Sequence, residues 1–176
     1  MKKITIALLL FSVFAITSCE GPMGPPGLDG DSIIGTIFEM EGDFLPSNNN
    51  ELFFNFPSNF EIFDTDVVLV YILWDVQDIN GKQTDVWRLL PQTVILDEGF
   101  IQYNFDNSVK DVRVFLETTI PFDELRPAET QDQVFRIAVL PADFIAKKSV
   151  DILDLNSLIK LQGIIFNIVK NAEIEP

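Results

Sequence analysis

An unbroken apolar run from Val67 to Trp74 most constrains what this chain can fold into. The run suits a buried central strand, because it is short for a helix and rich in β-branched side chains. Several later segments instead alternate apolar and polar residues, which is typical of strands with one buried face. Their apolar positions are Ile101, Tyr103 and Phe105, then Val112, Val114 and Leu116, then Phe135, Ile137 and Val139. The pattern predicts a mainly β protein with an antiparallel β-sandwich or barrel-like domain.

One short helix is expected near the C-terminus. Asp154 is a favourable N-cap for a helix through Leu155, Leu158 and Ile159. Gly163 is a typical residue at the end of such a helix, and a last strand is expected over residues 164–169. The expected domain therefore combines many strands with one short C-terminal helix.

The dipeptide Asn80-Gly81 predicts a β-hairpin with a two-residue type I′ turn, in which both central residues have positive φ. The register set by this turn places Trp74 opposite Trp87, so that the two tryptophans are cross-strand neighbours. A slip of one residue would place them on different faces of the sheet. A longer loop over residues 76–84 is the alternative. On the opposite face, the same register brings together a charged pair, Asp75 and Arg88.

The first nineteen residues have the layout of an export signal. Lys2 and Lys3 give a positive start, residues 4–16 are apolar or small, and Thr17-Ser18 precedes Cys19, the single cysteine. A helix needs about 20 apolar residues to cross a membrane, so this segment is too short to be a good transmembrane anchor. The order of these features predicts a signal peptide at residues 1–18.

The residues Ile16-Thr17-Ser18-Cys19 resemble a lipobox, the motif at which bacterial lipoproteins are cleaved before a lipid-modified cysteine. Ile16 and Ser18 stand where that family usually has Leu and Gly or Ala. The resemblance implies acyl chains on Cys19, and each methylene that they bury contributes about 0.8 kcal/mol to membrane attachment. Glu20 replaces the Asp that retains some of these lipoproteins in the inner membrane, which implies the outer membrane.

Residues 21–32 are four consecutive Gly-X-Y triplets, and they resemble the collagen-like stretches of some bacterial surface proteins. Only glycine fits at the axis of a collagen triple helix, but so short a segment cannot hold one alone. The segment is interpreted as a polyproline-type spacer of roughly 37 Å, with a trimerising stem as the alternative. The expected organisation is a signal peptide at 1–18, a lipidated tether at 19–32 and a single β-domain at 33–176.

Charge limits the partners of the mature chain. Without residues 1–18, ten Lys and Arg stand against twenty-seven Asp and Glu, which gives a net charge of −17. This charge repels phosphate backbones and anionic headgroups, so nucleic acid is not expected as a partner. Membrane attachment is therefore expected to depend on the lipid. One cysteine cannot form an intramolecular disulfide, and the many Phe, Ile, Leu and Val residues supply a core without one.

The sequence offers little catalytic chemistry. It contains no histidine, the usual general base and metal ligand, so no catalytic residue and no cofactor is expected. The one candidate metal is calcium, which binds oxygen ligands gathered in a loop; its candidate ligands are Asp75, Asp78 and Asn80, which equally suit the polar end of a hairpin. Carboxylate pairs that would suit glycoside hydrolysis also arise by chance in so acidic a chain. These pairs are Asp64 with Asp66 and Asp75 with Asp78.

Three functions are therefore weighed. The first is a non-catalytic, membrane-anchored surface lipoprotein with a binding or structural role in the cell envelope, whose partner is an unidentified protein or glycan. The alternative is a trimeric collagen-like stalk that carries an adhesive β head. A carboxylate-dependent hydrolase is the third.

Overall fold

The structure, a computed structural model, describes residues 35–142, 151–160 and 168–170. All of these residues belong to one unit of the chain, Ser32–Pro176. Gly163 and residues 164–167, where the start of a last strand is expected, lie outside the described residues. The last helix, Leu155–Ile159, has its C-cap at Lys160 and so ends earlier than the expected Gly163.

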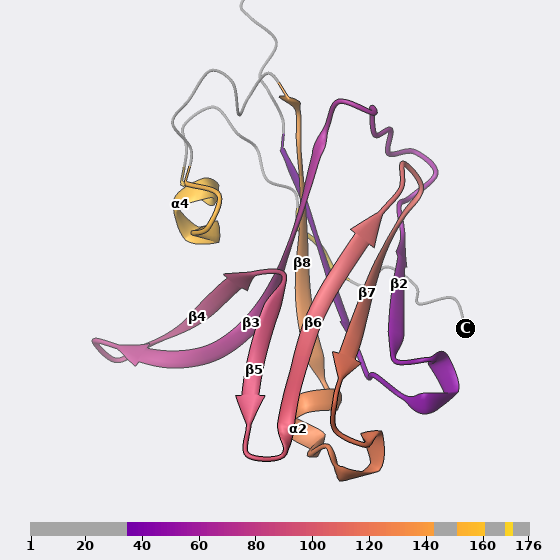
Figure 1. Ribbon diagram of the computed structural model, residues 1–176. Coiled ribbons are helices and arrows are strands. Elements are labelled where there is room, and N and C mark those ends of the chain that lie inside the picture. The colour runs from indigo at the N-terminus through magenta and orange to yellow at the C-terminus, as the bar shows by residue number, and fades with distance from the viewer. Residues whose placement is uncertain (1–34, 143–150, 161–167, 171–176) are drawn as a thin grey trace, which may run out of the picture. The chain divides into compact units, whose positions relative to one another are not determined.

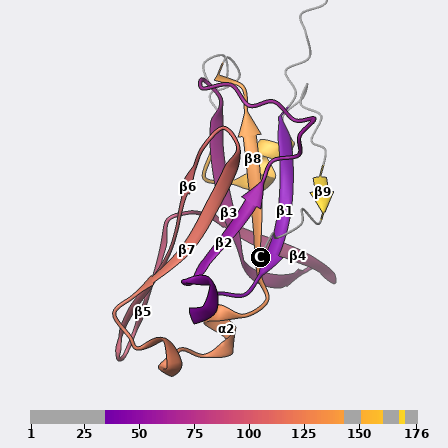
Figure 2. The same cartoon turned by 90° about the vertical axis from the view of Figure 1, so that its right-hand side faces the viewer.

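Two β-sheets form the unit (Figure 1). The five-stranded sheet has the order β4 (Lys82–Leu89), β3 (Val67–Ile79), β8 (Gln133–Leu140), β1 (Thr36–Gly42) and β9 (Ile168–Lys170). The four-stranded sheet has the order β2 (Glu51–Asn55), β7 (Asp111–Thr118), β6 (Gly99–Asn107) and β5 (Gln92–Leu96). Paired strands are antiparallel except β1 and β9, which run parallel (Figure 2). The expected mainly β, antiparallel sandwich is confirmed.

Helical segments are few and short among the described residues. They are η2 (Pro46–Asn48), η3 (Phe122–Glu124), α2 (Pro127–Thr130) and α4 (Leu155–Ile159). The expected N-cap of the last helix is confirmed, because Asp154 Oδ1 accepts a hydrogen bond of 3.0 Å from the Asn156 N–H. Among the described residues, no helix is both long and apolar enough to cross a membrane.

The main core lies between the two sheets and is rich in aromatic rings. Strand alternation points Phe38 of β1 and Phe54 of β2 inward, and each is only 1% exposed. The Phe38 ring centroid lies 5.1 Å from that of Phe54, 5.6 Å from that of Phe56 and 4.9 Å from that of Phe60. Tilted and edge-on ring contacts of this kind add to the stabilisation from buried area. Phe38 therefore links the five-stranded sheet to the edge of the four-stranded one.

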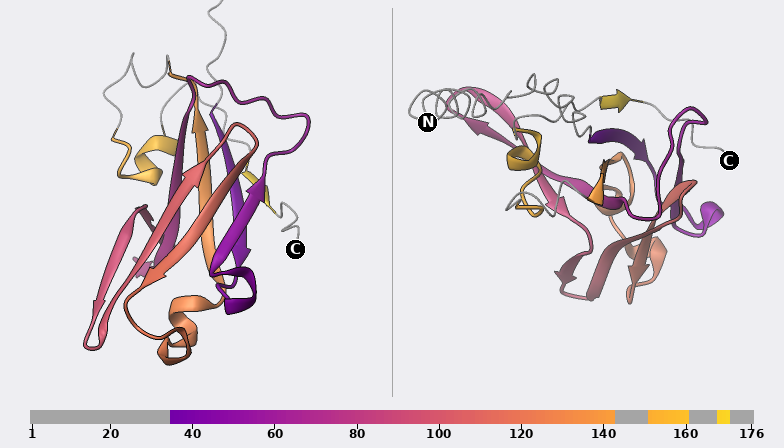
Figure 3. Two further views of the ribbon diagram at one scale, coloured as in Figure 1. Left: turned by 45° about the vertical axis from the view of Figure 1, so that its right-hand side comes forward. Right: turned by 90° about the horizontal axis from the view of Figure 1, so that it is seen from above.

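A second apolar cluster covers the opposite face of the five-stranded sheet. Leu155 and Leu158 of α4 are buried there with Tyr71 and Trp87, and α4 lies against this sheet (Figure 3). The Tyr71 hydroxyl donates a hydrogen bond of 2.6 Å to the carbonyl of Ile152. As a result, β3 has buried side chains on both of its faces over most of its first half.

The hairpin between β3 and β4 has the expected turn. Asn80 has φ +56° and Gly81 has φ +78°, as a type I′ turn requires. The next pairs also follow the expected register, from Ile79 opposite Lys82 to Asp75 opposite Val86. A β-bulge then interrupts the ladder at Trp74, and beyond it each residue of β3 faces a residue one position away from the expected one.

The expected pairing of the two tryptophans is therefore wrong. Trp87 faces Leu73 and belongs to the outer cluster, whereas Trp74 packs against the core between the sheets. Each ring instead stacks with a guanidinium group: the Arg88 Cζ lies 3.9 Å from the centroid of Trp74, and the Arg136 Cζ lies 4.1 Å from that of Trp87. The expected Asp75–Arg88 ion pair is also not found in the described part of the chain.

Two glycines that end tight turns should respond differently to substitution. Gly81→Ala should lower the free energy of unfolding by about 1 kcal/mol, because a Cβ there meets no atom and only the positive φ is strained. Gly99→Ala should cost more, because its Cβ would overlap the Thr119 side chain that accepts a 3.0 Å hydrogen bond from the Phe100 N–H. Urea unfolding of both variants tests this order, and equal costs would contradict it.

Candidate functional site

The residue on which the anchoring prediction depends, Cys19, lies outside the described residues, as does the whole of 19–32. Candidate sites in the structure must therefore be sought in the β-domain. Two of the sequence-based candidates fall on turns of the domain, and two further pockets lie around β5 and α2.

The candidate calcium ligands are spread along the β3–β4 hairpin, with Asn80 in the turn, Asp78 next to it and Asp75 opposite Val86. Asp75 and Asp78 are three positions apart on β3, and successive strand residues alternate sides, so these carboxylates lie on opposite sides of the ribbon. Asp78 Oδ1 accepts a 2.7 Å hydrogen bond from the Gly81 N–H, and Asp75 Oδ1 accepts one of 2.8 Å from the Val76 N–H. Within 35–142 and 151–160, no three acidic, cysteine or histidine side chains gather as metal ligands.

Asp64 and Asp66, the first carboxylate pair, line one pocket of about 350 Å³ beside the β6–β7 turn. Asp66 Oδ2 accepts a 3.1 Å hydrogen bond from the Phe63 N–H, so this carboxylate shapes its own loop. The residues opposite it in the pocket are Asn107, Ser108 and Val109. The structure thus brings the two carboxylates together but places no acid or base across from them in this pocket.

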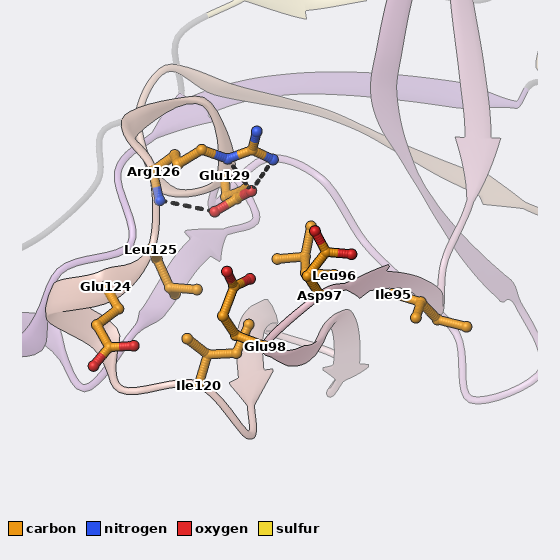
Figure 4. A pocket seen from close by; sticks show the side chains of 9 residues that line it. All are labelled: Ile95, Leu96, Asp97, Glu98, Ile120, Glu124, Leu125, Arg126 and Glu129. Carbon is orange, nitrogen blue, oxygen red and sulfur yellow. Dashed lines mark hydrogen bonds and ion pairs between the residues drawn. The ribbon is translucent and has the colours of Figure 1, made fainter.

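A larger pocket of about 410 Å³ lies where the β5–β6 turn meets the segment that contains η3 and α2, and we call it the turn pocket (Figure 4). Four carboxylates and one guanidinium group line it, so its charge is strongly negative. The lining residues are Ile95, Leu96, Asp97, Glu98, Ile120, Glu124, Leu125, Arg126 and Glu129. In Figure 4 the side chain of Ile95 points away from the other lining residues.

The one cation of the turn pocket is already paired. Arg126 Nε donates a 2.7 Å hydrogen bond to Glu129 Oε1, and the Arg126 backbone N–H donates one of 2.8 Å to Glu129 Oε2. Glu129 is 6% exposed, and its carboxylate accepts the hydrogen bond of the backbone N–H of Arg126, the N-cap residue of α2. Glu129, with a smaller contribution from Glu98, raises the pKa of the Arg126 guanidinium above its ordinary value. Asp97, Glu98 and Glu124 therefore face this pocket without a cation of their own among its lining residues.

A second pocket, of about 350 Å³, is lined by residues of β3 and β5 and shares Arg126 and Glu129 with the turn pocket, and we call it the side pocket. Its apolar wall is formed by Ile72 and Trp74 of β3 with Val94 of β5. Tyr103 completes this wall, and its hydroxyl donates a 2.8 Å hydrogen bond to the Glu129 carbonyl. The rest of the lining includes the polar residues Arg126, Glu129, Asp132 and Gln133. An elongated molecule that lies along β5 would therefore meet the apolar wall on one side and carboxylates at one end.

Sequence reasoning did not identify this region. The acidic residues 97–98 and the segment 124–129 are about thirty positions apart in the sequence. A hydrogen bond from the Tyr103 hydroxyl of β6 to the Glu129 carbonyl joins the second segment to the four-stranded sheet. The signal in the sequence is local: Asp97-Glu98-Gly99 has the composition of a turn, and Gln92–Leu96 is a short uncharged run before it. Comparison with known proteins adds no relative, because no family model, no curated protein and no solved structure matches the chain.

Proposed function

We propose that the protein is a non-catalytic lipoprotein of the bacterial cell envelope, held at the outer membrane by acyl chains on Cys19, whose β-domain binds a protein or glycan partner or has a structural role. The observation that carries the proposal is the order of the N-terminal features: a positive start, an apolar run and the motif Ile16-Thr17-Ser18-Cys19. The four Gly-X-Y triplets that follow act as a tether in this proposal.

The β-domain supports a binding role in two ways. Its turn pocket and side pocket lie next to each other and share Arg126 and Glu129, so one elongated ligand can reach both. The net charge of −15 for the whole chain opposes nucleic acid and anionic lipid surfaces, which favours an uncharged or cationic partner. No metal or cofactor is part of the proposal.

The anchor is tested by replacement of the single cysteine. In cells supplied with a labelled fatty acid, the native chain should incorporate label and sediment with membranes, and Cys19→Ala should lose both properties, because no other residue of the motif carries a thiol. Ser18→Ala is the matched control, since it keeps the cysteine and a small residue before it. Label retained by Cys19→Ala would refute the anchor.

The trimeric stalk with an adhesive head is the second candidate, and the exact repeat of glycine at every third position over residues 21–32 favours it. The native mass of the chain with and without residues 20–32 discriminates between the two. A trimer that becomes a monomer when the triplets are removed would favour the stalk.

A further inference from the structure

We propose that β5 is a docking strand, which binds an extended, cationic segment of a partner protein as an added antiparallel or parallel strand. This inference rests on the binding role proposed above and specifies the partner. The segment would hydrogen-bond to the backbone of β5, place alternate apolar side chains in the side pocket and direct Lys or Arg toward the carboxylates of the turn pocket.

The backbone N–H and C=O groups of Thr93 and Ile95 point to the side of β5 that no described strand occupies. The Phe100 N–H donates a 3.0 Å hydrogen bond to Thr119 Oγ1, and its carbonyl accepts one of 3.1 Å from the Thr119 N–H, so both groups point away from β5. Residues that face each other in an antiparallel pair either bond to each other or both point away. Ile95 faces Phe100, so its N–H and C=O point to the free side of β5. Thr93, two residues earlier, has the same orientation.

Strand β5 is at the end of the four-stranded sheet, and no described strand pairs with its free side. Exposed edges are usually protected from unwanted pairing by charged residues. The edge strand β4 contains Lys82, Asp85 and Arg88, and the edge strand β2 contains Glu51. In contrast, β5 has the uncharged sequence Gln-Thr-Val-Ile-Leu, and the side chain of Ile95 is 86% exposed. An unprotected apolar edge of this kind is the form that strand addition uses.

Charge and shape specify the occupant. Val94 points inward and forms part of the apolar wall of the side pocket, so an added strand would meet apolar surface with every second side chain. At the C-terminal end of β5, Asp97 and Glu98 follow directly, and Glu124 lines the same pocket. A cationic segment gains from these three carboxylates, whereas a second copy of this chain, at −15, would bring a like net charge to the same edge.

The probe is a short, end-blocked peptide that alternates lysine and valine, titrated against the full-length chain in non-ionic detergent and followed by fluorescence anisotropy. Ile95→Lys should weaken binding by about tenfold, because it places a charge on the docking edge. Glu98→Gln combined with Glu124→Gln should weaken it by about fivefold at low salt. A peptide of the same sequence with N-methylated amides should bind about tenfold more weakly, since it lacks donors for the β5 carbonyls.

The controls are exposed residues at the opposite end of the four-stranded sheet. Val109→Lys matches Ile95→Lys, and Glu61→Gln combined with Asp64→Asn matches the acidic pair. Equal losses in the test and control variants, or a peptide that does not bind, would overturn the docking strand. Conversion of a dimer to a monomer by Ile95→Lys would overturn it in favour of self-association. Acyl labelling of the same preparations separates the two proposals, because labelled protein that fails to bind peptide refutes the docking strand and leaves the anchor intact.

Discussion

Phe38→Ala is expected to lower the free energy of unfolding by about 3–5 kcal/mol, the usual cost of deleting a buried phenyl ring. The ring is 1% exposed and contacts the rings of Phe54, Phe56 and Phe60. Its removal leaves a cavity between the sheets that the strands cannot close without shifting their paired neighbours. The loss is measured as the shift in the midpoint of urea unfolding, with the slope of free energy against urea concentration unchanged.

Phe63→Ala is the matched control, because the same ring is deleted at a position that is 58% exposed. Its cost should stay within about 0.5 kcal/mol, as for other surface substitutions. A loss for Phe38→Ala no larger than that of the control would show that the contacts between the sheets contribute little to stability.

Alkaline pH should destabilise the fold through its two tyrosines. Burial, with a contribution from Glu129, raises the pKa of Tyr103 to about 12 from the ordinary value of 10.0. Burial, with contributions from Asp151 and Asp154, also raises the pKa of Tyr71. Above pH 10 the unfolded chain releases these protons while the folded chain retains them, so the free energy of unfolding falls as pH rises. For Tyr103 alone, the expected loss between pH 10 and 12 is about 2 kcal/mol.

Tyrosine-to-phenylalanine variants isolate this effect. Tyr103→Phe should cost about 1 kcal/mol at neutral pH, because the Glu129 carbonyl loses its 2.8 Å hydrogen bond. The same variant should show a shallower decline above pH 10, and the double variant with Tyr71→Phe the shallowest. Urea unfolding at intervals from pH 8 to about 12 measures the slopes. A double variant that declines as steeply as the native chain would assign the effect to other groups.

The strands and the turn chemistry could be predicted from sequence because both are local properties. Alternation identified β6, β7 and β8, and Asn80-Gly81 identified the type I′ turn. The register beyond Trp74 could not be predicted, because β3 is buried on both faces over most of its first half and its apolar run does not show which face a residue occupies. The structure shows the bulge that places Trp74 in the core.

The candidate site could not be predicted for a different reason. The sequence of Gln92–Leu96 is compatible with a central or an edge position, and the strand order that leaves β5 at the edge depends on pairings between distant segments. The acidic turn pocket likewise forms only because the fold places residues 97–98 and 124–129 next to each other. Local sequence patterns carry no information on contacts between segments so far apart in the chain.

The position of β1 has a mechanical consequence. β1 is the first strand of the described domain, and it pairs with β8 over seven residues, from Thr36 opposite Val139 to Gly42 opposite Gln133, and with β9 on its other side. Hydrogen bonds in an antiparallel pair run perpendicular to the strands. A pulling force that enters the domain at Thr36 along the strand axis therefore shears all the β1–β8 hydrogen bonds together instead of opening them one at a time. A load transmitted to the domain through β1 would therefore meet the β1–β8 pair in the direction in which it resists most.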